Sequence, residues 1–458
     1  MKLTSMRPEA IGAPGKPHGR VAFAAGPRMF TLLIAGLLVV PLLFMSHVFV
    51  WTLLAWNIVV TFLFALDLRK LPLPDELWVQ RSFDGALDQL KMARITVTLV
   101  NRSSRALRCE MVDAVPQALS VLPIEREALL PPKGSTRLEY EVVPSRRGNH
   151  EFSKIYLRYE GRLRIAQRWA CFKVEQSVRV YPMLTASRRQ EAMFMRSRQI
   201  ELQQRMIRQR GHGREFESLR EFQPGDERRD ICWTATARRA KLVTTLRQTE
   251  RSQTIWVMVD CGRLMRARHD RRSKLDYAAE TAMRLAQLAN FGGDSSALLA
   301  YGQRIQQRRL PGRGHSHLHT MLDQLALLEE EASEADHLHA AGALLTMQKR
   351  RAMIVWVTDL ADLSITPEVV SAALHANKRH LVVIALLGQP DVARLIAAEP
   401  ETTEQTYLYA AASETIRRRE LTIAGLRSRG VHVIEVDAPQ LTGAVLNKYL
   451  EAKQKNLF

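Results

Sequence analysis

Cysteine is scarce in this chain. The 458 residues include 4 cysteines, which lie far apart and form no CxxC pair: Cys109, Cys171, Cys232 and Cys261. This spacing indicates neither a zinc site nor a dense disulfide framework. The nucleotide-binding motif G-x-x-x-x-G-K-[ST] and the hydrolase motif G-x-S-x-G are both absent. The chain therefore lacks the signatures of the P-loop and α/β-hydrolase enzyme classes.

Acidic residues are also too few to balance the basic ones. There are 66 Lys and Arg against 47 Asp and Glu, a net charge of +19, while 46% of the residues are hydrophobic. This balance excludes a disordered chain, and the length predicts two or three domains. The basic surplus favours an anionic partner, either lipid or nucleic acid. Where the basic residues lie along the chain decides between these two partners.

Charged residues are missing altogether from one long stretch. Residues 29–66 contain no Asp, Glu, Lys or Arg. A membrane crossing needs about 20 apolar residues, so this stretch predicts two transmembrane helices, 29–45 and 47–66, joined near Ser46 and His47. Basic residues flank both sides, with residues 1–28 forming a basic tail and Arg69 and Lys70 following the stretch. Both ends are therefore expected to face the cytoplasm.

Two alternatives to this hairpin remain. A cleaved signal peptide has one apolar core of about 7 to 15 residues, which is shorter than the stretch present here. A single tilted span, with Pro41 inside it, would export the soluble part. The hairpin favours a two-pass membrane protein with its soluble domains in the cytoplasm.

Residues 71–183 contain short apolar runs separated by turn residues, a pattern typical of short β-strands. Apolar runs at 95–100, 138–143, 151–159 and 177–181 each end at or near turn residues. No long amphipathic helix interrupts them. The pattern predicts an immunoglobulin-like β-sandwich domain that offers no cluster of nucleophile and base.

Residues 254–458 show a different sequence pattern. Apolar strands at 254–260, 296–301, 353–359, 381–387 and 431–436 alternate with helices expected at 275–290, 317–330, 336–350, 367–377 and 415–428. Buried strands that alternate with helices predict a doubly wound, mainly parallel α/β domain. Ligands of such domains bind beyond the carboxyl ends of the strands, where Asp260 and Asp359 stand.

Residues 184–253 form a basic linker between these two domains. From Arg188 to Lys274 there are 22 basic and 11 acidic residues, so this tract holds more than half of the surplus. It is either a surface for anionic lipid or an acidic protein, or a solvated helix whose arginines pair locally. The tract lacks a pattern of aromatic residues interspersed among the basic ones, and it lacks a recognisable nucleic-acid-binding module. No nucleic-acid partner is therefore expected.

The most specific motif lies in this linker. Residues 213–238 read GREFESLREFQPGDERRDICWTATAR. Their order resembles the core of the domain-of-unknown-function 58 family, on Leu219, Arg220, Phe222, Pro224, Gly225, Asp226, Arg229, Ile231, Trp233, Ala237 and Arg238. The turn at Pro224 to Asp226 and the large side chain of Trp233 predict a segment that packs on the α/β domain, either as a structural plug or as an interaction surface.

The resemblance covers most of the chain and carries its own implications. Members of the family are membrane-associated bacterial proteins with a von Willebrand factor A-like domain, and they are often encoded beside MoxR-type AAA ATPases. Such a domain holds Mg²⁺ through Asp-x-Ser-x-Ser, a later Thr and a later Asp. The resemblance thus implies a site at Asp260, Ser316 and Asp359. Gly262 and Leu264 replace the two hydroxyls, so the site is degenerate, and the two acids alternatively cap helices or pair with Arg263.

Other candidate chemistry is less specific. His315, His317 and His319 have a spacing that suits a transition metal, but the run also opens a predicted helix. Cys232 and Cys261 are the candidate nucleophiles if the chain is a hydrolase.

The leading prediction is a membrane-anchored scaffold or interaction protein without enzymatic activity or cofactor, which the resemblance places in the bacterial inner membrane. Its partners are the lipid bilayer and, by resemblance, a MoxR-type ATPase with which it assembles or matures other proteins. No small-molecule substrate is evident. The alternative is an adhesion-type binding module that uses Mg²⁺ at the degenerate site.

Overall fold

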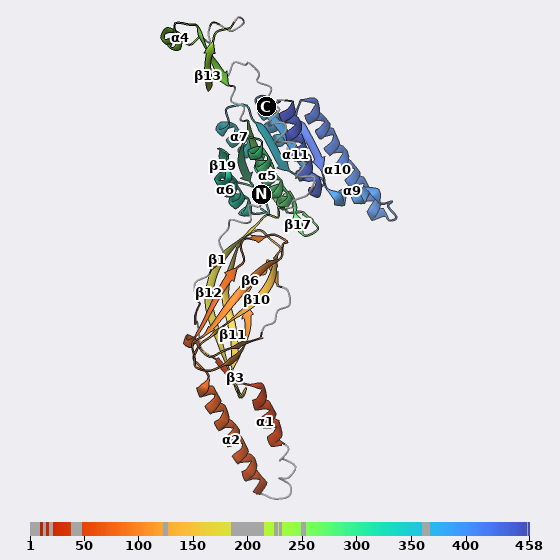
Figure 1. Cartoon of the computed structure of the whole chain (residues 1–458). Helices are drawn as coiled ribbons and strands as arrows, with labels where there is room; N and C mark the ends of the chain where they lie inside the picture. The colour runs from red at the N-terminus through yellow and green to blue at the C-terminus, as the bar shows by residue number, and fades with distance from the viewer. Residues whose placement is uncertain are drawn as a thin grey trace. The chain divides into compact units, whose positions relative to one another are not determined.

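The computed structural model of the chain describes residues 10–11, 15–17, 22–37, 48–121, 127–184, 215–223, 228, 231–248, 253–359, 367–455 and 457–458. The chain divides into two compact units, Met1–Met183 and Leu184–Phe458 (Figure 1). The prediction of a multidomain chain with both sheets and helices is confirmed.

The apolar stretch forms helices α1 (Pro27–Leu37) and α2 (Val48–Lys70). Within the described residues, one helix is long and apolar enough to cross a membrane: the segment Val50–Lys70 has a mean hydropathy of 1.7, and most of its side chains are exposed. Its length of about 30 Å matches the hydrocarbon core of a bilayer. Helix α1 is too short for that, and the rest of the first predicted crossing, residues 38–45, lies outside the described residues. The two-pass arrangement therefore stays a prediction.

Helices α1 and α2 pack side by side where they are described (Figure 1). The indole Nε1 of Trp56 on α2 donates to the carbonyl oxygen of Leu32 on α1 at 3.0 Å. Gly36 permits this approach, because a Cβ atom there would lie 2.6 Å from the Trp56 ring. The aromatic ring thus fills the space that the glycine leaves.

Two mainly antiparallel sheets form a β-sandwich around one core. One sheet has the order β1-β4-β6-β10-β8 and the other β2-β12-β11-β7-β9, with β3 and β5 also paired to β12. Burial alternates along the strands, so one face of each sheet supplies the core. The strands are β4 (Leu77–Phe83), β5 (Leu87–Asp88), β6 (Ala93–Asn101), β7 (Leu107–Asp113), β8 (Leu119–Val121), β9 (Glu127–Leu130), β10 (Ser135–Pro144), β11 (Gly148–Glu160) and β12 (Ala166–Tyr181).

Parts of the predicted N-terminal tail, residues 10–11, 16–17 and 22–25, pair with this sandwich, which corrects the boundary at residue 28. Strand β1 (Ala10–Ile11) pairs with β4, and β2 (Lys16–Pro17) and β3 (Ala22–Ala25) pair with β12. The reason is that β4 and β12 have edges whose backbone groups need partners, and the tail supplies them. The tail therefore covers strands that lie on both sheets.

The second unit contains a six-stranded sheet with the order β19-β18-β15-β20-β21-β22. All neighbours are parallel except β18 and β19. This is the strand order of a doubly wound fold. The strands are β15 (Thr254–Asp260), β18 (Ser295–Tyr301), β19 (Ile305–Gly312), β20 (Met353–Thr358), β21 (Leu381–Leu387) and β22 (His432–Val436).

Helices cover both faces of this sheet (Figure 1). One face carries α5 (Lys274–Phe291), α6 (His315–Ala326) and α11 (Leu441–Gln454), and the other carries α7 (His337–Met347), α8 (Pro367–Asn377) and α10 (Thr403–Ser428). The central strands β15, β20 and β21 are buried almost throughout, which explains their continuous apolar sequences. A short helix α9 (Pro390–Ala397) precedes α10.

Candidate functional site

Two acids meet at the carboxyl edge of the α/β sheet. Asp260 ends β15 and Asp359 follows β20, and these strands are parallel neighbours. Asp260 is buried, and its carboxylate accepts hydrogen bonds from the Thr358 hydroxyl at 2.6 Å and the Gly262 N–H at 2.7 Å. Burial raises the pKa of Asp260, and these hydrogen bonds and the nearby His337 oppose the shift. The predicted juxtaposition of Asp260 and Asp359 is thus present.

Cations of the chain itself surround Asp359. The Lys274 ammonium lies 2.5 Å from one carboxylate oxygen, and the Arg419 guanidinium lies 3.4 Å from the other. Arg419 also pairs with Glu435 at 2.6 Å and donates to the Leu387 carbonyl oxygen. Lys274, Asp359 and Arg419 are all buried. Neither acid pairs with Arg263, as the alternative interpretation proposed, because Arg263 bonds to Glu334.

Ser316 does not join the two acids. It lies exposed in the first turn of α6, next to His317, whose ring Nε2 contacts the Ser296 carbonyl oxygen at 2.8 Å. Ser296 lies near the start of β18, whereas Asp260 lies at the end of β15. The reason is that β19 runs antiparallel and returns the chain to the opposite edge of the sheet. The predicted set of three ligands is therefore wrong in this chain.

The residues present do not fit Mg²⁺. The ion requires near-octahedral oxygen ligands, but the Asp359 carboxylate faces the Lys274 ammonium and two further N–H donors. The position that a divalent cation would take beside Asp359 is thus filled by Lys274. In the described part of the chain, no group of three or more His, Cys, Asp or Glu side chains could hold a metal ion.

The histidine run and the cysteines are likewise separate. His315 and His319 are exposed on α6, whereas His317 is buried and faces Ser296 and Arg309. Cys261 is buried beside Asp260, and the Cys232 thiol lies 3.4 Å from the Thr234 hydroxyl.

The signature segment forms a small unit that the sequence did not predict. Strands β13 (Glu215–Glu221) and β14 (Val243–Gln248) pair antiparallel, and helix α4 (Trp233–Arg239) lies between them in sequence. Trp233 is 67% exposed, so the prediction that it anchors the segment by packing is wrong. Arg238 is exposed on α4, and the backbone of Arg220 pairs with Thr244. Four predicted residues lie outside the described residues: Pro224, Gly225, Asp226 and Arg229.

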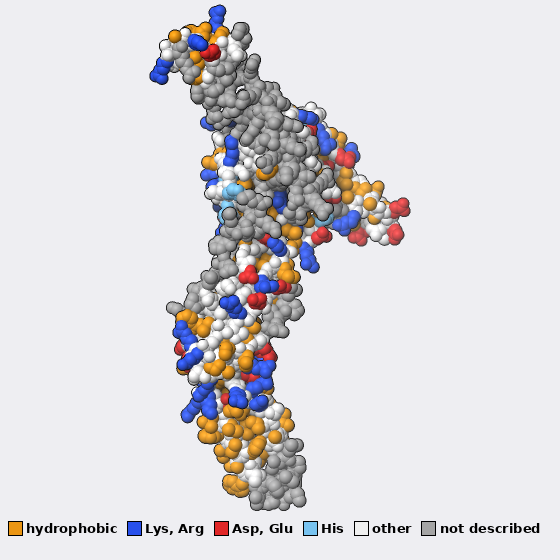
Figure 2. Space-filling view, viewed as in Figure 1, with side chains coloured by type: hydrophobic (Ala, Val, Ile, Leu, Met, Phe, Trp, Pro, Cys, Tyr) orange, Lys and Arg blue, Asp and Glu red, His pale blue; other side chains and the backbone are white. Residues whose placement is uncertain are grey.

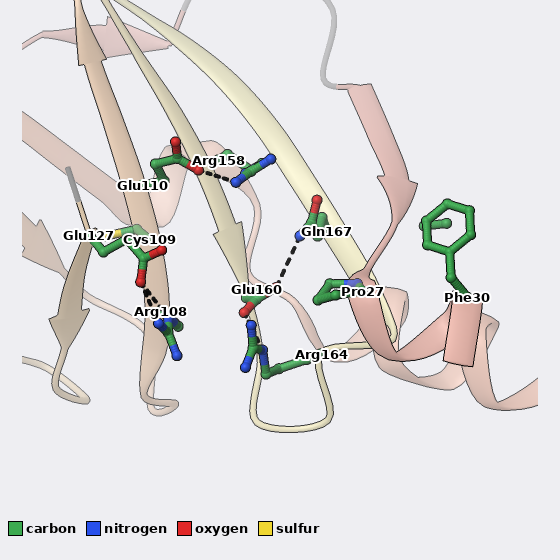
Figure 3. A pocket seen from close by; sticks show the side chains of 11 residues that line it. Pro27, Phe30, Arg108, Cys109, Glu110, Glu127, Arg158, Glu160, Arg164 and Gln167 are labelled. Carbon is green, nitrogen blue, oxygen red and sulfur yellow. Dashed lines mark hydrogen bonds and ion pairs between the residues drawn. The ribbon is translucent and has the colours of Figure 1, made fainter. Parts of the chain in front are cut away.

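A polar cavity of about 430 Å³ opens in the first unit, on the outer face of the sandwich beside the start of α1. Three ion pairs line it, and Figure 3 shows their side chains facing one another: Arg108 with Glu127, Arg158 with Glu110, and Arg164 with Glu160. Its lining is therefore balanced in charge. Burial raises the pKa of Cys109, which also lines it, to about 12. Sequence reasoning missed this cavity because separate strands supply its side chains.

A group of exposed apolar side chains in the second unit lies on α9 and the start of α10. Every residue from 401 to 411 is exposed, and the start of α10 extends away from the sheet with α9 (Figure 1). Tyr407 is 74% exposed, and Leu395, Leu408 and Tyr409 accompany it. Glu399, Glu401 and Glu404 lie in the same stretch, and Figure 2 shows orange and red side chains together there. We call α9 and residues 401–411 the helical projection.

Comparison with known proteins assigns part of the chain to a family. Residues 218–427 match the family model described as "Protein of unknown function DUF58", so the chain carries a DUF58 domain over this range. An uncharacterised protein of Mycobacterium bovis is 31% identical over 153 residues, which is 32% of this chain and 48% of that protein. The uncharacterised protein YeaD of Bacillus subtilis is 27% identical over 134 residues, 28% of this chain and 32% of YeaD. The chain thus spans about half or less of the length of these relatives.

Solved structures resemble the chain only distantly. The conserved hypothetical protein BatB of Bacteroides thetaiotaomicron is 14% identical with a TM-score of 0.29, and it covers 45% of this chain and 100% of its own. A PapD-like domain of human CEP192 is 10% identical with a TM-score of 0.17, and it covers 21% of this chain and 76% of its own. Both scores are low, so the fold rests on the strand orders described above.

Proposed function

We propose that this chain is a membrane-anchored, non-enzymatic interaction protein that recruits other proteins through its α/β domain. The observation that carries this proposal is the helical projection, where aromatic and aliphatic side chains stand in solvent on a helix exposed on every side. Exposed apolar side chains that gather in one place mark interaction sites. The acidic rim at Glu399, Glu401 and Glu404 favours a partner with a basic edge around an apolar groove.

Anchorage in the bacterial inner membrane is the second part of the proposal. Helix α2 has the length and composition of a membrane crossing, and α1 packs against it. In the proposed arrangement, the apolar residues between them complete a first crossing. Both soluble units then lie in the cytoplasm, since Arg69, Lys70 and Arg28 flank the helices.

The proposed partner is a MoxR-type AAA ATPase, with which the chain assembles or matures other proteins. This step rests on the DUF58 resemblance, and so does the description of the α/β domain as von Willebrand A-like. The pairing of Asp359 with Lys274 and Arg419 supports a domain that binds through its surface and without a metal-bridged carboxylate.

A site-specific crosslink tests the proposal. A photoreactive amino acid replaces Tyr407 in the full-length chain in its native membranes, and a second variant carries it at Leu310, a leucine of β19 that is 59% exposed. We expect the Tyr407 position to crosslink to an AAA ATPase in a nucleotide-dependent way, and the Leu310 position not to. Equal labelling from both positions, or no ATPase among the products while other membrane complexes stay intact, would overturn the proposal.

A further inference from the structure

Four loops of the sandwich are tied together where helix α2 ends. The Asp67 carboxylate near the end of α2 accepts the backbone N–H groups of Ile165 and Ala166, each at 3.0 Å. Gly26, just before α1, donates to the Ile165 carbonyl oxygen at 2.7 Å. The loop at 161–165 therefore holds the sandwich ends of both helices.

The remaining loops join the same end of the sandwich. The Tyr159 hydroxyl donates to the Pro72 carbonyl oxygen at 2.9 Å, and the Arg102 N–H donates to the Glu76 carbonyl oxygen at 2.9 Å. The Lys133 N–H donates to the Ser103 carbonyl oxygen at 2.9 Å. The loops at 71–76, 101–106, 131–134 and 161–165 thus form one surface around the point where the apolar helices leave the sandwich.

Exposed basic side chains dominate this surface, and we call them the helix-proximal ring: Arg28, Arg69, Lys70, Arg102, Arg105, Lys133 and Arg162. The exposed acids of the same loops and helix ends are Asp75 and Glu76. In the described part of the chain, none of the ring side chains forms an ion pair with a carboxylate. Figure 2 shows blue side chains where the orange helices meet the sandwich. This surface differs from the cavity of Figure 3, where each arginine has a glutamate.

Apolar and aromatic side chains accompany the ring. Trp78 is 40% exposed, and the Arg102 guanidinium stacks 3.5 Å from the centre of its ring. Leu73, Leu163 and Phe30 are 54%, 42% and 57% exposed at the same end. Tryptophan and arginine side chains of this kind suit the boundary between lipid headgroups and acyl chains.

We infer that the helix-proximal ring binds the headgroups of anionic phospholipids and seats the sandwich on the membrane surface. This inference rests on the proposed membrane anchorage and adds a ligand to it. The basic charge is continuous with the apolar surface of α2, so a lipid beside the helix presents its phosphate to the ring. The sequence pointed instead to residues 188–274 as the basic surface, because counting along the chain does not reveal charges that separate loops bring together.

Spin-labelled lipids test the inference on the full-length chain in vesicles. The measurement compares how strongly phosphatidylglycerol and phosphatidylcholine labels are immobilised by the protein. One basic side chain beside an anionic lipid contributes about fivefold in association. We therefore expect about a fivefold preference for phosphatidylglycerol, which declines as salt is added.

Two triple variants sharpen the test. R69Q, K133Q and R162Q together remove ring charges whose side chains form no hydrogen bond or ion pair in the described structure, and the preference is expected to fall. The matched control K349Q, K378Q and R379Q removes exposed charges from the α/β domain and is expected to keep the preference. Immobilised lipid without headgroup preference, or a loss of preference in the control alone, overturns the inference and leaves anchorage intact. No immobilised lipid of either kind overturns anchorage itself.

Discussion

Each unit of the molecule buries an acid against basic side chains, and the two clusters differ in position. In the sandwich, Arg81 and Asp113 have side-chain exposures of 0% and 1% and lie 2.5 Å apart. The Tyr140 hydroxyl donates to the Asp113 carboxylate, and the Arg81 guanidinium donates to the Val174 carbonyl oxygen. In the α/β domain, Asp359 meets Lys274 and Arg419 at the sheet edge where ligands of such folds bind.

This difference separates an ion pair inside a core from a cluster of charges at an edge where ligands bind. The Arg81 pair lies inside the sandwich core, where the Arg81 guanidinium also lies 4.7 Å from the centre of the Phe152 ring. The Asp359 cluster lies beyond the carboxyl ends of the strands, the edge where ligands of open α/β sheets bind. A buried acid at such an edge is therefore weak evidence for a metal until its neighbours in space are known.

The largest effect is expected from breaking the buried pair of Arg81 and Asp113 in the sandwich. Asp113→Ala leaves the Arg81 charge buried without compensation, which costs about 3–5 kcal/mol of unfolding free energy. Hydrogen exchange measured by mass spectrometry on peptides of β7 and β11 would report this loss. The control Glu175→Ala removes an exposed partner of Lys173 on the same sandwich and is expected to change little. Equal protection in both variants would contradict the structural role.

A smaller loss is expected from Lys274→Met in the α/β domain. Asp359 keeps Arg419 and Gln389 within 3.4 Å, so the cost of removing Lys274 is about 1–3 kcal/mol. Hydrogen exchange of peptides from β15 and β20 measures it. A variant as stable as the wild type would show that Lys274 does not compensate Asp359.

Acid should destabilise the α/β domain modestly. Burial lowers the pKa of His317 and of His380 in the folded state. Below the ordinary histidine value of about 6.5 the unfolded chain therefore takes up more protons, so stability falls as the pH is lowered. Thermal unfolding at about pH 7 and about pH 5 checks the direction, and His317→Gln together with His380→Gln should reduce the dependence. A midpoint that rises on acidification of this domain would contradict it.

The smallest effect is expected from an exposed pair in the same domain. Hydrogen bonds from Lys455 and Lys448 lower the pKa of Glu451 to about 2, yet its side chain is 42% exposed. Solvent screens the pair, so Glu451→Gln is expected to cost under about 0.5 kcal/mol. A loss comparable to that of Lys274→Met in denaturant unfolding would remove the distinction between buried and exposed pairs.

Elements with continuous apolar runs could be predicted from the sequence, because such a run is visible in the residues of the element itself. Helix α8 and strand β21 have the predicted bounds, and the predicted runs of the sandwich lie within β6, β10, β11 and β12. Helix α9 and the first half of α10 were missed. Residues 403–411 of α10 are exposed on all sides and show no amphipathic period. The antiparallel strand β19 was missed too, and this omission placed Ser316 at the wrong edge of the sheet.

The candidate site was predictable only in part. Asp260 and Asp359 could be identified because they stand at the predicted ends of strands. Their partners Lys274 and Arg419 are far from Asp359 in sequence and belong to no recognisable motif. The strands β1, β2 and β3 are too short to be recognised among basic residues. Spatial neighbours of this kind depend on the fold and not on local patterns.

Calorimetric titration of the full-length chain with Mg²⁺ most directly tests the central claim that Lys274 and Arg419 neutralise the acidic edge. The account predicts no heat of binding at millimolar Mg²⁺ and no change in thermal stability on adding a chelator. A binding heat that disappears in Asp359→Asn would contradict it, because it would show that the metal displaces Lys274 from the carboxylate.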